Sequence, residues 1–394
     1  MTQSLDYPAG NRYHPVAKEL ARLGHQVRIL ALHPAWSSLP QKSLVVDSVP
    51  VTYVAPMHVR QVGNRRLYYS PVALFGVAAW ATLAMAVRLL TNPGDIVHVG
   101  KPHPMNGLAA LVAGHLLHDR PLYLDCDDYE ARVNRFAGTW QQWGVAAVEN
   151  ILPRWARGIT VNTRFQVERL AALGYPRERI VYVPNGVDRE RFALPDAARV
   201  RALRARWNLE GRQAVVYVGS LSVTSHAVDL LVEAFARVRC TLPDAVLLLV
   251  GGGEDYDMVA SLIGRLGLDD CVRLVGRVPF EEVPYYYALG DVTVDPVRDD
   301  VVSSARCPLK IFESMALGVP VVTGDVGDRR ELLGDGQAGL VVPPGDIAAL
   351  AEGLVSVLAN PDQAAALSQA ARTVRERYYW DVLVHEWMQV YSLS

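Results

Sequence analysis

Short runs of β-branched and aliphatic residues alternate with longer helical stretches along almost the whole chain. Apolar runs without a regular polar alternation are typical of strands that are buried on both faces of a sheet. The expected strands are 27–32, 51–54, 96–99, 122–124, 159–162 and 180–183 in the first half, and 214–218, 246–250, 272–275, 292–294, 320–323 and 339–342 in the second. Strands that alternate with helices predict an α/β fold whose parallel sheets consist of βαβ units.

A charged stretch of Arg, Glu, Pro and Ala separates the two sets of strands. A chain of 394 residues is also too long for one ordinary core and suits two domains. We therefore expect a Rossmann-like N-terminal domain over 1–188, a linker over 189–211 and a Rossmann-like C-terminal domain over 212–375.

The beginning of the chain is unusual for a doubly wound domain. Residues 12–23, followed by Gly24, predict a helix with its C-cap, and this helix leads into the strand at 27–32. A strand is expected before that helix, in the middle of the sheet, but residues 1–7 contain no apolar run. Either the first strand is missing because the true start lies upstream, or 2–5 forms a remnant of it; we favour the first interpretation.

The segment 72–87 carries no charge and is flanked by Arg65, Arg66 and Arg88. It is shorter than the roughly 20 apolar residues that a membrane-spanning helix needs. The preferred interpretation is a buried or partly exposed helix of the N-terminal domain. The alternative is an interfacial helix that rests on anionic lipid through its arginines, which would give peripheral membrane contact through 65–88.

Composition narrows the class of protein. Hydrophobic residues make up 51% and charged residues 20%, which is typical of globular proteins, and a net charge of −2 argues against a nucleic-acid partner. The four cysteines are widely spaced and form no metal-ligand pattern, so we expect reduced thiols. Reduced thiols together with a short polar start predict a cytoplasmic protein, or one associated with the inner face of the membrane.

The segment 307–320, CPLKIFESMALGVP, is the strongest candidate for chemistry. Pro308 suits a first helical turn, and Gly318 suits its end. A helix that begins after a strand points its N-terminus at the carboxyl edge of the sheet, where phosphate is favoured. Lys310 could neutralise a diphosphate there, and Glu313 could accept hydrogen bonds from a ribose diol. The alternative is a solvated Lys–Glu pair at helical spacing.

This segment resembles the donor-binding helix of the GT-B-fold retaining glycosyltransferases of family 4, the glycosyl transferases group 1, in the subgroup with a P-x-K-x-x-E motif. Five further segments follow that family's order, at 183–188, 217–235, 247–255, 272–279 and 339–346. The resemblance covers nearly the whole chain. It implies two Rossmann-like domains facing across a cleft, with a hexosyl group transferred from a nucleoside-diphosphate sugar such as a UDP-sugar to a saccharide or lipid-linked acceptor. It also implies retention of configuration, no metal and no other cofactor.

On the donor side, the resemblance places Gly219 and Ser220 in the first phosphate loop and Glu313 at the donor ribose. Arg277 and Val278 fall where the family's backbone meets the base.

The phosphate loop departs from the family pattern, because Ser220 and His226 stand where an Arg and a Lys are usual. We therefore expect Lys310, Arg306 and the helix N-termini to stabilise the diphosphate.

On the acceptor side, Gly10 lies in a segment that replaces the family's glycine-rich loop. The run DCDD at 125–128 follows a strand where the family often has a His-Asp pair, so Asp127 replaces the His and Asp128 keeps its Asp. Three acids there suggest a sugar-hydroxyl site, and helix capping is the alternative. Lys101 and His103 follow the strand at 96–99 and point toward the same edge. Lys310, Glu313 and Asp127 are thus the catalytic candidates, without an assigned general base.

The aromatic end of the chain, 376–394, resembles the family's C-terminal helix, which returns to brace the N-terminal domain. Two rival functions remain open at this point: a non-catalytic nucleotide-sugar-binding partner of another transferase, and a nucleotide-sugar epimerase of similar build.

Overall fold

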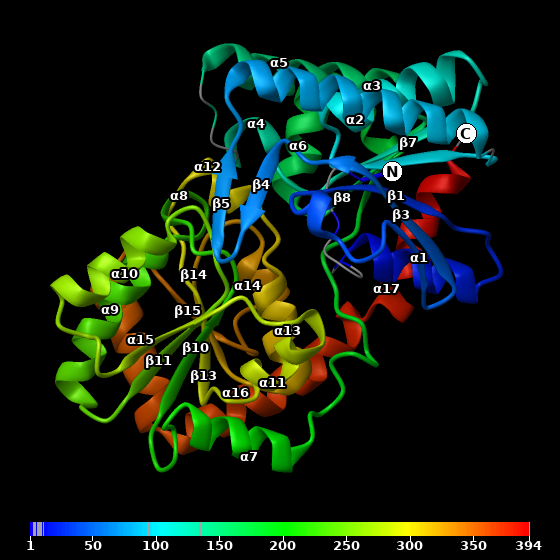
Figure 1. Ribbon diagram of the computed structural model, residues 1–394. Helices are drawn as coiled ribbons and strands as arrows, with labels where there is room; N and C mark the ends of the chain where they lie inside the picture. Colours follow the sequence, from blue (N-terminus) through cyan, green and yellow to red (C-terminus); the bar gives the residue numbers. More distant parts are fainter. Residues whose placement is uncertain are drawn as a thin grey trace.

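The computed structural model describes residues 1–2, 5, 10, 12–92, 94–133, 136 and 138–393. Two α/β domains are apparent in Figure 1: the blue-to-green half of the chain builds the upper one, and the green-to-orange half builds the lower one. The red C-terminal segment runs back to the upper domain, so that both chain ends lie there.

The N-terminal sheet is mainly parallel. Strands β6, β7, β8 and β9 pair in that order, β1 is parallel to β3, and β2 is antiparallel to β3. The strands are β1 (Ile29–His33), β2 (Ser43–Val46), β3 (Val49–Pro56), β6 (Val97–Gly100), β7 (Leu122–Cys126), β8 (Gly158–Val161) and β9 (Ile180–Tyr182). A separate hairpin consists of β4 (Val59–Val62) and β5 (Arg65–Tyr68).

The middle of this sheet is closed by the first two residues. Thr2 forms parallel bridges with both Ala31 of β1 and Gly100 of β6. Its N–H donates to the Leu30 carbonyl at 2.9 Å, and the Gly100 N–H donates to the Met1 carbonyl at 2.7 Å. The preferred interpretation, a missing first strand, is therefore wrong, because Thr2 forms a remnant of that strand. The expected remnant's Gln3 and Ser4 lie outside the described residues.

Helices cover the faces of the N-terminal sheet. They are α1 (Tyr13–Arg22), α2 (Pro71–Thr91), α3 (Pro104–Ala109), the π-helical turn η2 (Ala110–Leu116), α4 (Glu130–Val133), α5 (Thr139–Ile151) and α6 (Arg164–Ala172). Helix α2 contains the uncharged segment, and its Ala81, Met85 and Leu89 are buried. Only 17% of its most apolar 18-residue window is buried, and by length and composition alone the helix could cross a membrane. Of the expected buried or partly exposed helix, the structure has the partly exposed form, with most of its surface exposed, and at 21 residues the helix is longer than the uncharged segment indicated.

The C-terminal sheet is entirely parallel, with strand order β12-β11-β10-β13-β14-β15. Its strands are β10 (Ala214–Val218), β11 (Val246–Val250), β12 (Val272–Gly276), β13 (Val292–Asp295), β14 (Val321–Gly324) and β15 (Leu340–Val342). Because the chain fills one side of β10 and then crosses to β13 on the other, the switch point lies between these two strands. Ligands of open α/β sheets bind outside the carboxyl ends of strands at such a point.

Helices also cover both faces of the second sheet (Figure 1). They are α8 (Val223–His226), α9 (Val228–Thr241), α10 (Tyr256–Arg265), α11 (Val283–Tyr287), α12 (Val301–Ser304), α13 (Leu309–Leu317), α14 (Arg329–Leu332), α15 (Ile347–Ala359) and α16 (Pro361–Val374), with α7 (Ala197–Arg206) before the first strand. All five residues of β11 are buried, as a continuous apolar run predicts. Each of the twelve expected strands is present; the unpredicted β2, β4 and β5 are short and largely exposed.

The last helix ties the two domains together. Helix α17 (Trp380–Met388) buries Trp380, Leu383 and Trp387 in one apolar cluster with Val16 and Val183 of the N-terminal domain. Just before it, the backbone of Val187 exchanges hydrogen bonds with Tyr378 and Trp380 at 2.9 and 3.1 Å.

Candidate active site

Buried polar side chains gather where the carboxyl edge of the C-terminal sheet faces the N-terminal domain. The first of these loops follows β10 and touches the loop after β11. A Cβ on Gly251, whose φ is 137°, would lie 1.9 Å from the Gly219 carbonyl oxygen. The two loops can therefore meet only because a side chain is absent. Ser220 lies in the same loop, and its carbonyl accepts a hydrogen bond from the Tyr217 hydroxyl at 2.6 Å.

Lys310 points from the first turn of α13 into this loop. Pro308 caps the helix and Gly318 ends it with φ 69°, as the sequence predicts. The Lys310 ammonium lies 3.4 Å from Asp295 Oδ1 and 5.2 Å from the centroid of the Tyr217 ring. Lys310 and Glu313 are only 6% and 5% exposed, so the alternative of a solvated pair is wrong.

Arg306 lies beside Lys310 and shares a partner with it. Its Nη1 donates to His226 Nδ1, and the Lys310 ammonium lies 3.5 Å from the same nitrogen. Burial and the charges of Arg306 and Lys310 hold the pKa of His226 well below its usual value. His226 is therefore neutral at pH 7: it orients Arg306 and does not replace a cation. Arg306 Nε is buried without a hydrogen-bond partner among the described residues, so it can still donate to a ligand.

The counter-charge for these cations is Asp295, at the end of β13. Its Oδ2 accepts a hydrogen bond from Nε of the fully buried Arg329 at 2.9 Å. Burial alone would raise the pKa of Asp295, but the charges of Arg329, Lys310 and Arg306 outweigh it and lower the pKa to about 2. We call Lys310, Arg306, Arg329, His226 and Asp295 the cationic cluster. It holds three cations against one carboxylate, an excess that suits an anion.

Glu313 lies one helical turn beyond Lys310. Its Oε2 accepts a hydrogen bond from the Tyr287 hydroxyl at 2.7 Å. Burial and the nearby Glu313 carboxylate raise the pKa of Tyr287 well above its usual value, so the hydroxyl stays a donor. The Glu313 carboxylate is thereby held in one orientation.

Arg277 and Val278 follow β12 at the same sheet edge. The backbone N–H of Arg277 donates to Asn64 Oδ1 at 3.0 Å, which brings the β4–β5 hairpin of the other domain against this loop. Val278 is partly buried against a C-terminal core cluster.

Across the domain junction, Lys101 stands among three carboxylates. Its ammonium lies 2.6 Å from Asp128, 3.4 Å from Asp127 and 3.6 Å from Glu130. Lys101 has a left-handed backbone with φ 53°, and the Asn106 amide donates to its carbonyl at 3.0 Å. We call Lys101, Asp127, Asp128 and Glu130 the acidic cluster.

Asp127 is the most perturbed member of the acidic cluster. Burial raises its pKa to about 8 despite the nearby Lys101, and its Oδ1 is buried without a hydrogen-bond partner among the described residues. This is not the arrangement of a solvated or capping carboxylate. Asp128 also acts electrostatically on Arg306, so the two clusters face each other. The oxygens of Asp127, Asp128 and Glu130 lie within 4.8 Å of one another and could hold a metal ion, but Lys101 already supplies a positive charge there.

Family models match both halves of the chain. A glycosyl transferase 4-like domain matches residues 9–186, and the domain described as glycosyl transferases group 1 matches residues 212–360. The chain belongs to the group 1 glycosyltransferases. Both matched domains are glycosyltransferase domains, so the rival interpretation of an epimerase finds no support.

The relatives of this glycosyltransferase include named mannosyltransferases. A GDP-mannose-dependent α-(1-6)-phosphatidylinositol monomannoside mannosyltransferase of Mycolicibacterium smegmatis is 34% identical over 54% of this chain and 56% of its own length. The chain thus spans about half the length of such relatives. A phosphatidyl-myo-inositol mannosyltransferase of Mycobacterium leprae is 26% identical over 99% of this chain and 94% of its own length.

Solved structures confirm the GT-B fold of the glycosyltransferase. Sucrose-phosphate synthase from Thermosynechococcus elongatus superposes with a TM-score of 0.76, at 19% identity over 96% of this chain and 91% of that one. Anabaena HepE, in complex with UDP and glucose, gives a TM-score of 0.70 at 18% identity over 96% and 94%.

In this glycosyltransferase, the prediction that Asp125 belongs to a sugar-hydroxyl site is wrong. Asp125 is fully buried within β7, and Arg12 donates to both of its oxygens at 2.7 and 2.8 Å. Arg12 also donates to Asn185 at 2.9 Å, so this ion pair joins the N-terminal core to the segment that leads to the linker.

The remaining acceptor-side candidates are buried. His103 precedes α3 and stacks on His58 with ring centroids 5.1 Å apart, and burial together with His58 holds its pKa well below the usual value. Gly10 is buried, but most of its neighbours in the segment 7–14 lie outside the described residues.

Sequence reasoning also missed several residues. Asp295, Arg329, Tyr287 and Asn106 position the candidates above. A signal existed for Asp295 alone, because an acidic residue directly follows the expected strand at 292–294.

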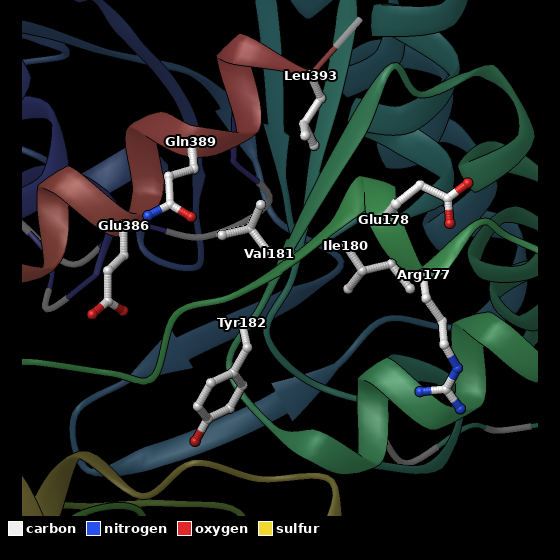
Figure 2. A pocket seen from close by; sticks show the side chains of 8 residues that line it. All are labelled: Arg177, Glu178, Ile180, Val181, Tyr182, Glu386, Gln389 and Leu393. Carbon is white, nitrogen blue, oxygen red and sulfur yellow. The ribbon is translucent and has the colours of Figure 1, made fainter.

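One hollow lies away from these residues, between edge strand β9 and the C-terminal helical segment (Figure 2). Its volume is about 430 Å³, and it is lined by Arg177, Glu178, Ile180, Val181, Tyr182, Glu386, Gln389 and Leu393. It is not at the carboxyl edge of the C-terminal sheet and contains no member of either cluster, so we do not assign the chemistry to it.

Proposed function

We propose that this glycosyltransferase moves a hexosyl group from a nucleoside-diphosphate sugar to a saccharide or lipid-linked acceptor, with retention of configuration. The observation that carries the proposal is the cationic cluster, in which Lys310 is buried and Arg306 is half-buried at the switch point of the C-terminal sheet. Retention rests on the resemblance of the P-x-K-x-x-E segment to the retaining family.

In this proposal, the leaving diphosphate is stabilised by Lys310, Arg306 and the N-terminus of α13. Cations that are already fixed in a desolvated site stabilise developing negative charge without reorganising, which is the main source of rate enhancement in such sites. These side chains make a metal ion unnecessary for that step. Glu313, oriented by Tyr287, would accept hydrogen bonds from the donor ribose.

The acceptor would meet the donor at the acidic cluster. We propose that Asp127, whose Oδ1 has no partner among the described residues, accepts a hydrogen bond from a sugar hydroxyl. Asp128, Lys101 and His103 would line the same side. Catalysis then depends on holding donor and acceptor in line, which converts a bimolecular encounter into a step within one complex.

We further propose a mannosyl donor and a lipid-linked acceptor, because the relatives named above are mannosyltransferases for phosphatidylinositol substrates. The N-terminal domain has a surface that suits this acceptor. Helices α2, α3 and α5 lie together at the top of Figure 1, and η2 continues directly from α3. Large apolar side chains of α2, η2 and α5 are exposed. These include Val72, Phe75, Trp80 and Leu83 on α2, Val112 and Leu116 on η2, and Trp140 and Trp143 on α5.

This apolar surface would rest on the membrane, with Trp140 and Trp143 at the headgroup level. Arg65 does not serve this contact as the sequence suggested, because it pairs with Asp257 of the other domain at 2.9 Å. The double variant Trp140→Ser/Trp143→Ser should lose cosedimentation with anionic phospholipid vesicles. Leu194→Ser, which removes an exposed apolar side chain from the linker region, should not. Equal vesicle binding by both variants would contradict the contact.

The transferase proposal is tested by calorimetric titration with UDP- and GDP-sugars, followed by an assay for release of the free diphosphate. Lys310→Ala and Glu313→Ala should each abolish transfer or donor hydrolysis while the far-UV circular dichroism is unchanged. Arg330→Ala, which removes an exposed cation paired with Asp325 on the same domain, is the matched control. Unchanged turnover in either site variant would sink the assignment, and donor binding without turnover by the wild type would favour a non-catalytic binder.

A further inference from the structure

The β4–β5 hairpin reaches from the N-terminal domain to the loops of the C-terminal sheet. In Figure 1 it extends downward from the upper domain toward the lower one. Its tip is Gly63 and Asn64, where Gly63 has φ 57°. The Asn64 carbonyl accepts a hydrogen bond from the Gly253 N–H at 2.9 Å, and Asn64 Oδ1 accepts one from the Arg277 N–H at 3.0 Å. Asn64 thus bonds to the loops after β11 and β12 at once.

Asn64 lies so close to the loops after β11 and β12 that the positions it contacts there must be glycine. A Cβ on Gly252 would lie 2.4 Å from the Asn64 carbonyl oxygen, and one on Gly276 would lie 2.8 Å from Asn64 Nδ2. Backbone N–H groups at the carboxyl ends of strands, kept open by glycine, are the groups that bind nucleotides in α/β sheets. Here Asn64 of the same molecule uses two such groups, one through its backbone carbonyl and one through its side chain.

We propose that the hairpin is an internal occupant of the nucleoside end of the donor site, and that a nucleotide must displace Asn64 to bind. This inference rests on the proposed function and on the family resemblance, which implies that the backbone at Arg277 meets the base. The Asn64 carboxamide presents a carbonyl next to an amino group, as the edge of a base does, so it stands in for the base at Arg277.

The attachment of the hairpin to the C-terminal domain is weak enough for it to dissociate. The hairpin has two strands and is joined to the C-terminal loops by one isolated bridge, between Arg65 and Gly253, and two-stranded hairpins have little stability of their own. Its side-chain anchor is the ion pair between Arg65 and Asp257, which are 62% and 64% exposed, and exposed ion pairs contribute little. A ligand that offers the same hydrogen bonds and also meets the cationic cluster can therefore compete with it.

Two measurements test the displacement. In the first, amide hydrogen exchange of 59–68 is followed in the full chain with and without UDP or GDP. Displacement predicts faster exchange in the hairpin when nucleotide is bound. Unchanged or slower exchange with nucleotide bound would overturn the proposal. The hairpin would then be a clamp, with Arg66, whose charge acts on His226, as a donor-site cation.

In the second measurement, the Kd of the same nucleotide is compared among hairpin variants. If the hairpin is docked about 90% of the time, releasing it tightens binding about tenfold. Asn64→Ala and Arg65→Glu should both show this change, and the swap Arg65→Glu/Asp257→Arg should restore the wild-type Kd. Arg60→Glu is the control, because it changes charge on the same hairpin at a side chain that stacks on Tyr69.

The outcomes separate this proposal from the proposed function. If the wild type binds the nucleotide and Asn64→Ala and Arg65→Glu bind it equally well or more weakly, the proposal of an internal occupant is overturned. The proposed function is then not affected. Binding by neither the wild type nor Arg65→Glu contradicts the donor site itself, and the internal occupant falls with it.

Discussion

The two sides of the domain junction both bury charged groups, but their excess charge has opposite sign. In the cationic cluster, Lys310, Arg306 and Arg329 surround one carboxylate, Asp295. In the acidic cluster, one ammonium, Lys101, stands among three carboxyl groups. The first arrangement is incomplete without an anion. The second keeps one carboxyl group, Asp127, largely protonated at neutral pH, because burial raises its pKa to about 8.

The comparison indicates how the work is divided between the domains. Buried cations in excess cost desolvation energy that an arriving diphosphate can offset. An acidic cluster whose excess charge is negative does not attract an anion, but its oxygens can bind hydroxyl groups. Each of the following variants removes one part of one cluster.

Among the variants that follow, Arg306→Ala should have the largest effect on turnover. Its guanidinium has a buried, unused Nε, and loss of a fixed cation at a developing anion costs roughly 10²- to 10³-fold in turnover. Calorimetry should also show weaker binding of the nucleoside diphosphate. Asp128→Asn, on the acidic side, should instead raise the KM for the acceptor and leave diphosphate affinity unchanged. Equal effects of both variants on diphosphate affinity would remove the distinction between the clusters.

Lys101→Met should reduce stability more than any other change on the acidic side. The variant keeps the aliphatic stem but leaves the carboxylates without their counter-charge, and breaking such a pair costs about 3 kcal/mol. The deficit in unfolding free energy should be larger at pH 8 than at pH 5, because Asp127, whose pKa burial raises to about 8, is protonated at pH 5 and adds no repulsion there. Denaturant unfolding at both pH values measures it, with the exposed Lys42→Met as control. A deficit independent of pH would show that Lys101 acts through packing.

His226→Ala should reduce turnover by about tenfold, less than Arg306→Ala, because His226 only orients the arginine. His226→Gln, which keeps a hydrogen-bond acceptor, should recover most of the activity. Since burial and the neighbouring cations hold its pKa well below the usual value, neither variant should change the pH dependence of turnover between pH 6 and 8. Loss of an activity step near pH 6.5 in His226→Gln would show instead that the histidine works as a cation.

The sequence predicted the cationic side better than the acidic side, for a physical reason. Lys310 and Glu313 lie three residues apart on one helix, so local periodicity brings them to one sheet edge. The neutral role of His226 depends on Arg306, 80 residues away, and the ion pair of Arg12 with Asp125 spans 113 residues. Periodicity carries no information about such pairs. As a result, Asp125 was grouped with Asp127 although one is structural and the other faces the junction.

The same limit applies to the hairpin. Strands β4 and β5 are four residues each and mostly exposed, so they leave no apolar run in the sequence. The bond of Asn64 to Arg277 spans 213 residues. Six of the predicted strands (β1, β7, β8, β11, β13 and β14), in contrast, are buried at every position, and continuous burial leaves the clearest pattern in a sequence.

Asp127→Asn should change stability with a sign opposite to that of Lys101→Met. The folded carboxyl group stays protonated up to about pH 8, whereas in the unfolded chain it ionises from its ordinary value of 3.8 upward. The folded wild type therefore binds more protons than the unfolded chain between these values, and its stability falls as the pH rises through this window. Asn resembles the protonated acid and can turn its oxygen toward Lys101. The variant therefore does not lose stability as the pH rises through this window. The Tm of the variant should exceed that of the wild type by a few degrees at pH 8, at about 2–4 °C per kcal/mol, and by less at pH 5. Scanning calorimetry at the two pH values decides the matter: a Tm difference that does not grow with pH would place an ionised Asp127 in the acidic cluster, whose excess negative charge would then be larger than the structure indicates.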